Sequence, residues 1–309
     1  MRRYALAVTT LSLILIVAAS AHTQTPQAAL DHYQNAARKI SKGDLDGAID
    51  DYSRAIVLSS SLAPVKKGAS NAFAPDDVTI VNPFTANAYN NRGLVKYEKG
   101  DFVGAIEDLD QAIKIRPGLA SAYLNRGAAR RSLDDPEGAL KDFSKAIALQ
   151  RDFFQAYSNR GSLKHDLGDD AGALKDLDHA IKLNDEVAEP FYQRGYVRLA
   201  LKNLDGSLAD FSRAIELKPD LAWAHQGQGV TLMSKGNMEL AIQSFTNAIK
   251  YDENLSWAYF NRGLARIYLG NESEAEKDFA TCLKLRPSLK ADLDNRIELA
   301  RTLKLKARN

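Results

Sequence analysis

Residues 120–153 read ASAYLNRGAARRSLDDPEGALKDFSKAIALQRDF, and the chain restates this pattern at a fixed interval. The motif Tyr-x-Asn-Arg-Gly places a glycine at 93, 127, 161 and 263, and glycines at 195 and 229 fill the gaps at the same 34-residue spacing. Self-similarity at one period is the signature of an array, in which copies of one structural element stack against their neighbours. The sequence therefore predicts a repeat protein.

Counting the repeat from Ala86 places Gly93 at repeat position 8. Six contiguous repeats then follow without insertion or deletion, at 86–119, 120–153, 154–187, 188–221, 222–255 and 256–289. A further copy at about 29–62 is numbered repeat one, so the six contiguous copies are repeats two to seven.

Each repeat is predicted to form two helices joined by a turn. The first helix runs from about position 2 to position 14, and a glycine followed by Asp or Asn marks the turn, as at Gly168-Asp169. The second helix begins near an alanine at position 20 and carries apolar residues at helical spacing, as at Ala139 and Phe143. Pro117, Pro219 and Pro287 close three of the repeats, because proline cannot continue a helix.

Small residues recur where the two helices should approach closely. Glycine at position 8 and alanine at positions 20 and 27 leave room between helix backbones, and an aromatic or Leu at position 24 is expected to fill the space between neighbouring repeats. At these positions the chain resembles the tetratricopeptide repeat family, over about 29–62 and 86–289. In repeat three the matching residues are Tyr123, Gly127, Ala139, Phe143 and Ala146.

The resemblance implies an all-α fold, a right-handed superhelical solenoid of antiparallel helix pairs. It also implies that the first helices line a concave face that binds a peptide or protein segment. Positions 2, 5, 9 and 12 of each first helix share one side. The candidate groove residues at these positions are Asn87, Asn90, Ser121, Gln155, Tyr192, Tyr196, Trp223, Met233, Trp257 and Phe260.

Two segments lie outside the repeats, and repeat one itself departs from the pattern, with Ala36 where the others have Gly and Asn35 where most have Arg. Residues 63–85 form an insertion with three prolines, which we interpret as a surface loop or as a flap that contacts a partner. Residues 290–309 are predicted to form a helix that caps the last repeat, as the end of a solenoid requires, followed by a basic tail.

The N-terminus has the layout of a secretory signal peptide. Arg2 and Arg3 precede an apolar run over 5–19, and Ala19-Ser20-Ala21 provides a small-x-small cleavage site. We therefore expect residues 1–21 to be removed and the protein to be exported, to the periplasm or beyond if it is bacterial. An uncleaved anchor helix and a mitochondrial transit peptide are the alternatives, and the apolar run is short for a membrane span.

Cleavage would leave the chain close to neutral. Lys and Arg fall from 41 to 39 without Arg2 and Arg3, and Asp and Glu number 39. A nucleic-acid partner is therefore not expected, since nucleic-acid binding depends on a basic surface. A membrane partner is expected only if the N-terminal segment is not cleaved. The one cysteine, Cys282, cannot form an internal disulfide.

Arg at position 7 and Asp at position 23 recur together in the repeats. Position 7 is Arg and position 23 is Asp in repeats two, three, four, five and seven, whereas repeat six loses both at once, with Gln228 and Ser244. The joint loss indicates an ion pair that bridges the two helices of one repeat. The alternative is a row of arginines that binds an anionic polymer.

Residue patterns that carry catalysis do not occur. His165 and His179 lack a Cys or carboxylate cluster at metal spacing, and Gly227-Gln228-Gly229 falls inside a predicted helix, where it cannot form a phosphate-binding loop. His32 and His225 occupy position 4, where packing accounts for them. We therefore expect no enzyme activity, no metal and no cofactor.

These observations together predict a scaffold or adaptor that binds a peptide or protein. Aromatic and Met side chains in repeats five to seven should dominate binding, with polar groups of repeats two to four orienting the partner. The alternative is a structural or self-assembling envelope protein, held at the membrane if the N-terminal helix is retained.

Overall fold

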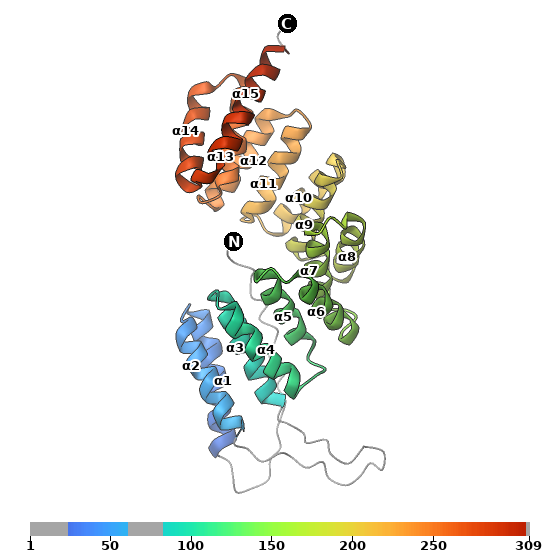
Figure 1. The fold of residues 1–309 in the computed structure, drawn as a ribbon, viewed down its shortest axis with the longest axis vertical. Helices are drawn as coiled ribbons and strands as arrows, with labels where there is room; N and C mark the ends of the chain where they lie inside the picture. Colours follow the sequence, from blue (N-terminus) through green and yellow to red (C-terminus); the bar gives the residue numbers. More distant parts are fainter. Residues whose placement is uncertain (1–23, 61–82, 307–309) are drawn as a thin grey trace. The chain divides into compact units, whose positions relative to one another are not determined.

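The computed structural model describes residues 24–60 and 83–306 of the 309-residue chain. These residues form fifteen α-helices and one 3-10 helix, with no strand among them. Figure 1 shows the helices following one another as antiparallel pairs. The prediction of an all-α array of helix pairs is confirmed. The expected signal peptide, and residues 63–82 of the insertion, lie outside the described residues.

The first helices of repeats one to seven are α1 (Gln24–Ser41), α3 (Pro83–Glu98), α5 (Ala120–Ser132), α7 (Phe154–Asp166), α9 (Ala188–Ala200), α11 (Ala222–Ser234) and α13 (Ser256–Leu269). The second helices are α2 (Leu45–Ser60), α4 (Phe102–Ile115), α6 (Pro136–Leu149), α8 (Asp170–Leu183), α10 (Leu204–Leu217), α12 (Met238–Tyr251) and α14 (Glu272–Leu285). A 3-10 turn at Pro287–Leu289 leads into α15 (Lys290–Lys306).

The chain divides into two compact bodies. The N-terminal body ends at Ala156, inside α7, and the C-terminal body comprises the rest of the chain. Each body stacks repeats of the same construction, so the same local contacts recur in both.

The turn inside each repeat has a left-handed residue at position 15. Five of these residues are glycines with φ between 78° and 87°, namely Gly43, Gly100, Gly168, Gly236 and Gly270. Repeats three and five place Asp134 (φ 62°) and Lys202 (φ 58°) there instead. A side chain in this conformation carries a steric cost that glycine avoids.

The residue after the turn caps the second helix. In repeat two the Asp101 carboxylate accepts a hydrogen bond of 2.9 Å from the Gly104 backbone N–H, and Asp44, Asp135, Asp169 and Asn203 cap their helices in the same way. Such a cap satisfies a backbone donor that the first turn of a helix leaves open. The turn and the cap together explain the Gly-Asp pairs of the sequence.

Glycine at position 8 lets the side chain at position 24 of the same repeat reach the opposite helix. A Cβ added to Gly127 would lie 2.7 Å from the Phe143 ring, and one added to Gly195 would lie 3.0 Å from Phe211. Phe211 also touches the next repeat, since a Cβ on Gly227 would lie 2.2 Å from its ring. Position 24 therefore packs within its own repeat, and in this case between repeats as well.

Repeat two begins earlier than its register suggests. The interpretation of 63–85 as an insertion included Pro83 and Thr85, whereas α3 starts at Pro83 and Thr85 is 3% exposed. The Thr85 hydroxyl donates a hydrogen bond of 2.9 Å to Ser59 at the end of α2. Proline suits the first turn of a helix, because the backbone N–H that it lacks has no partner there.

The last repeat is covered by α15. Leu293 and Ala300 of α15 are 1% and 2% exposed, and they pack in one cluster with Phe260 and Leu264 of α13. The helix thus buries an apolar face that would otherwise be open to water at the end of the array.

Candidate functional site

The ion pair inferred from the sequence is present in every repeat that carries both residues. The carboxylate of the position-23 Asp accepts two hydrogen bonds from the position-7 Arg, and the shorter N–O distance is 2.6 to 2.8 Å. The pairs are Arg92–Asp108, Arg126–Asp142, Arg160–Asp176, Arg194–Asp210 and Arg262–Asp278. Each pair joins the first helix of a repeat to the second, so the prediction is confirmed.

A second cation holds the same carboxylate. Position 11 is Lys or Arg, and its nitrogen lies 2.7 to 3.0 Å from the Asp in repeats two to five and seven. In repeat one, where position 7 is Asn35, the Asp51 carboxylate is held by His32 and Lys39, each at 2.8 Å. His32 is therefore part of this charge network, which the packing interpretation missed.

The position-7 Arg also reaches back to the preceding repeat. The third guanidinium nitrogen of Arg126, Nη1, donates a bond of 2.6 Å to Asp110, and Nη1 of Arg194 donates one of 2.6 Å to Asp178. The same guanidinium lies over the ring at position 4, as Arg126 does over Tyr123 at 5.4 Å. Arg92 and Arg262 donate instead to the hydroxyls of Ser53 and Thr246 in the preceding repeat. Because these arginines are already held by their own Asp and by the preceding repeat, they are not available to a row that binds an anionic polymer.

Repeat six keeps the geometry without the charge. Gln228 accepts a hydrogen bond of 2.9 Å from the Ser244 hydroxyl and donates one of 3.3 Å to Ser212 of repeat five. Position 11 is Leu232 in this repeat. All three charged groups are thus replaced together, and a neutral hydrogen-bonded set takes their place.

The ion pair of Asp176 changes the pKa of its carboxyl group. Burial alone would raise the pKa of this carboxyl group, but hydrogen bonds from Arg160 and Lys164 outweigh burial. The pKa of Asp176 therefore lies below its ordinary value.

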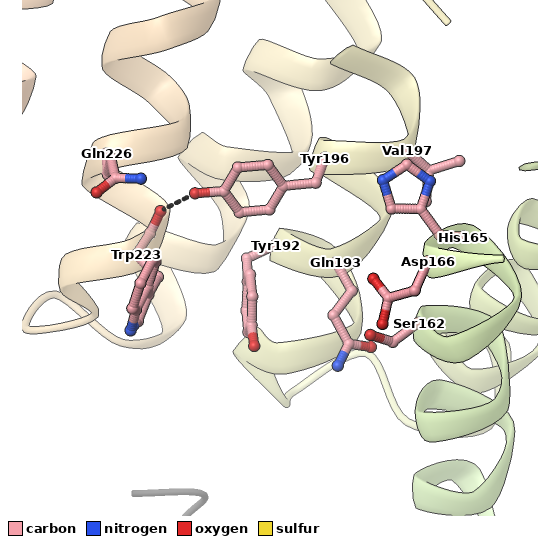
Figure 2. Close-up of a pocket in the computed structure, with 9 residues that line it drawn as sticks. All are labelled: Ser162, His165, Asp166, Tyr192, Gln193, Tyr196, Val197, Trp223 and Gln226. Atoms are coloured by element: carbon pink, nitrogen blue, oxygen red, sulfur yellow. Dashed lines mark hydrogen bonds between the residues drawn. The ribbon is translucent and has the colours of Figure 1, made fainter. Parts of the chain in front are cut away.

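The first helices of the C-terminal body enclose an open hollow of about 310 Å³, which Figure 2 shows. Its aromatic side consists of Tyr192 and Tyr196 of α9 and Trp223 of α11. In Figure 2 the side chains of Tyr192 and Trp223 extend in the same direction, and Tyr196 crosses from α9 toward α11 above them. Trp223 is 39% exposed, which is high for a tryptophan on a packed helix. We call this site the aromatic hollow.

The opposite side of the aromatic hollow is polar. Ser162, His165 and Asp166 of α7 line it, and His165 Nδ1 lies 2.5 Å from the Asp170 carboxylate at the start of α8. Gln193 of α9 also lines it and accepts a hydrogen bond of 2.5 Å from the buried Ser158 hydroxyl. Val197 and Gln226 complete the lining.

Tyr196 and Gln226 form the rear of the aromatic hollow. The Tyr196 hydroxyl donates a hydrogen bond of 2.9 Å to the backbone carbonyl of Trp223, which ties α9 to α11. Burial raises the pKa of Tyr196, and a hydrogen bond from Gln226 offsets part of this rise. Gln226 is 8% exposed, and its Oε1 atom is buried without a hydrogen-bond partner.

Most of the lining residues lie at the repeat positions that the sequence assigns to the groove. Ser162, His165, Tyr192, Tyr196, Trp223 and Gln226 all occupy positions 2, 5, 9 or 12. Of the candidate groove residues, the structure brings together Tyr192, Tyr196 and Trp223. Gln226 was not among the candidates, although it sits at position 5, because a single buried amide gives no signal in a sequence.

The remaining candidates of the C-terminal body lie elsewhere. Phe260 was expected in the groove, but it is 0% exposed and packs beneath α15, so its side chain belongs to the core. Trp257 is half-buried against the same cluster, with its ring 5.0 Å from Phe260. Met233 is half-buried beside Leu232 and Phe245. Gln155, near the end of the N-terminal body, is half-buried and is not part of the hollow's lining.

The other candidates of the N-terminal body are Asn87, Asn90 and Ser121. Asn87 and Ser121 are half-buried, whereas Asn90 is 7% exposed. The Asn90 amide donates to Asn91 at 3.0 Å and accepts from Asn125 at 3.1 Å. The bond from Asn125 joins α5 to α3, so Asn90 contributes mainly to the stacking of these first helices.

The described residues contain neither a metal-binding cluster nor an exposed thiol. No cluster of three or more His, Cys, Asp or Glu residues that could hold a metal ion occurs within 24–60 and 83–306. Cys282 is buried, and burial raises the pKa of its thiol. Within those same ranges, no helix combines the length and apolar character that crossing a bilayer requires.

Comparison with protein families decides the classification. The tetratricopeptide repeat model matches residues 120–153, 154–186, 188–221, 224–255 and 258–289, and a second TPR repeat model matches 93–134. The chain belongs to the tetratricopeptide repeat family. The matched segments follow the register of the sequence to within a few residues. No curated protein matches the chain in sequence.

Solved structures share the fold at low sequence identity. A tetratricopeptide repeat protein from Parabacteroides merdae is 17% identical, with a TM-score of 0.61 over 90% of this chain and 99% of its own. PilF from Pseudomonas aeruginosa is 17% identical, with a TM-score of 0.60 over 72% and 97%. PilW, a type IV pilus biogenesis factor, is 19% identical, with a TM-score of 0.60 over 65% and 94%. At these identities the likeness concerns the fold.

Proposed function

We propose that this tetratricopeptide repeat protein is an exported, non-enzymatic scaffold that binds a peptide or protein segment along the first helices of its C-terminal body. The aromatic hollow is the main contact. Export rests on the signal-like layout of residues 1–21. N-terminal sequencing of the protein recovered from its compartment should begin after Ala21; a chain that still begins at Met1 would contradict export by cleavage.

The observation that carries the proposal is the convergence of Tyr192 and Trp223 on one open hollow. Tyr and Trp are the side chains that most often dominate protein interfaces, because they bury a large area at a small entropic cost. Trp223 remains 39% exposed in this protein, whereas Phe211 and Phe245 of neighbouring helices are fully buried. A partner segment would cover the exposed ring, as an interface core requires.

Site-specific photo-crosslinking tests this assignment in the native compartment. A photoreactive phenylalanine analogue at Tyr192 or Trp223 should join the protein to a discrete partner. The control is the same analogue at Leu240 of α12, which is 52% exposed and lies outside the hollow. Equal products from Leu240, or no product from the two hollow positions, would exclude the aromatic hollow as the binding site.

A second candidate function, self-assembly, is favoured by a different observation. Position 14 carries exposed leucines at the ends of first helices in the C-terminal body. Leu167, Leu201 and Leu269 are 51%, 49% and 37% exposed. Light scattering on the purified chain tests this candidate: an oligomer that dissociates on combined substitution of these leucines by Ser supports it, and a monomer at all concentrations excludes it.

A further inference from the structure

We propose that the aromatic hollow accepts a basic side chain, Arg or Lys, from the partner segment. This inference rests on the proposed function, because it specifies the chemistry of the segment that binds there. Two independent features of the described residues lead to it: the distribution of charge and the paired aromatic rings.

The residues that line the aromatic hollow include a carboxylate but no Lys or Arg. None of the nine residues that line it is Lys or Arg, and Asp166 contributes a carboxylate. Positions 2, 5, 9 and 12 of repeats four to seven contain no Lys or Arg at all, and Glu189 is their one acidic residue. The cations of α9 are engaged on its other side, where Arg194 and Arg198 bind Asp210 at 2.6 and 2.9 Å.

The exposed ring of Trp223 and the half-buried ring of Tyr192 suit a cation. The side chains of Tyr192 and Trp223 run in the same direction from adjacent helices, so they bound the space on two sides (Figure 2). The face of an aromatic ring attracts a cation through its quadrupole, and Trp and Tyr are the stronger partners. An aliphatic side chain between the rings would lack the attraction of a cation to the ring faces.

Arg and Lys carry N–H donors and positive charge together, which an apolar or acidic side chain does not. Such a side chain suits a site that offers aromatic faces and a carboxylate and no competing Lys or Arg.

Short peptides that differ in one charge test the proposal on the full chain. The probe is acetyl-Gly-Gly-Arg-Gly-Gly-amide, and the matched control carries citrulline, the neutral isostere of Arg. Binding is followed by NMR through the indole N–H signals of the protein's two tryptophans, assigned with Trp257→Phe. We expect the Arg peptide to shift the Trp223 signal saturably and the citrulline peptide to bind about tenfold more weakly.

Substitutions in the protein separate the contributions. Asp166→Asn should weaken binding of the Arg peptide severalfold, whereas Gln243→Leu, on the exposed face of α12, should leave its affinity unchanged. Citrulline binding as tight as Arg binding, or no shift with the Arg peptide, overturns the inference. If crosslinking at Trp223 succeeds in that case, the hollow still binds a partner and only the basic side chain is excluded.

Discussion

Asp142 is a repeated residue whose contacts hold the two helices of its repeat together. Its carboxylate is 3% exposed and accepts hydrogen bonds from Arg126 and from Arg130. Removing one member of such a cluster leaves the others charged and poorly solvated, whereas replacing the whole cluster by a neutral set costs far less. Repeat six demonstrates that the neutral set is compatible with the fold.

We therefore predict that Asp142→Ala lowers the free energy of unfolding by about 3 kcal/mol. The triple substitution Arg126→Gln, Arg130→Leu and Asp142→Ser, which copies repeat six, should cost clearly less than Asp142→Ala. Urea unfolding followed by circular dichroism measures both. A triple variant that is as unstable as Asp142→Ala would contradict the cluster interpretation.

The lowered pKa of Asp176 predicts that the contribution of its ion pair to stability depends on pH. Its folded-state pKa is depressed below the unfolded value, so its pair stabilises the protein above the unfolded pKa of about 3.9. That stabilisation is lost as pH falls through the lower folded-state pKa. The difference in melting temperature between the wild type and Asp176→Asn should thus be large at neutral pH and shrink below about pH 3; a difference that stays constant would refute the assignment.

At the scale of single residues, the sequence predicts pairing well and burial poorly. The joint loss of Arg and Asp in repeat six identifies the position-7 to position-23 pair because both changes fall in one repeat. Repeat six also has Leu232 at position 11, where the other repeats have Lys or Arg. A single apolar residue on a helix does not by itself identify position 11 as part of the ion pair. The unpaired Oε1 of Gln226 depends on the surroundings of one atom, which no repeat pattern records.

Among the elements, the turns offer the simplest test. Lys202 adopts φ 58° at a position where five repeats have glycine. A non-glycine residue in this conformation costs about 1 kcal/mol. Lys202→Gly should therefore raise the melting temperature, and Ala at Gly168, which has φ 84°, should lower it. Calorimetry of the two variants checks the prediction, which fails if Lys202→Gly is destabilising.

The helix α15 explains why Phe260 was misplaced. The register treats position 5 alike in every repeat, and Gln226 at position 5 of repeat six does line the aromatic hollow. In repeat seven α15 lies over this face, and Arg296 of α15 stacks over the Phe260 ring at 5.8 Å. The difference arises from the end of the array, where the neighbour is a capping helix and not another helix pair.

Removing the anchor of α15 should expose this face. Leu293 is 1% exposed, and Leu293→Ala should cost about 2 to 4 kcal/mol through lost burial and a cavity. Because repeats interact mainly with their neighbours, the effect should concentrate in α13, α14 and α15. Hydrogen exchange should quicken there and stay unchanged in α9; uniform acceleration across the chain would contradict a local role.

In the whole molecule, the residues that recur and the residues that differ have separate tasks. Recurring residues such as Gly127, Phe143 and Asp142 hold helices together inside the array. The aromatic hollow is built where the copies disagree, at Tyr192 and Trp223. The sequence alone predicts the array because thirty-four-residue periodicity is a property of the whole chain. It does not predict the hollow as a unit, since three helices contribute to it.

The most direct test of this division is hydrogen exchange of the full chain with and without the partner that crosslinks at Trp223. We predict that binding slows exchange at short labelling times in the first helices α7, α9 and α11, which line the aromatic hollow. The second helices α8, α10 and α12 should be unaffected at those times. Protection confined to the second helices, or no protection in α9 and α11, would contradict the account.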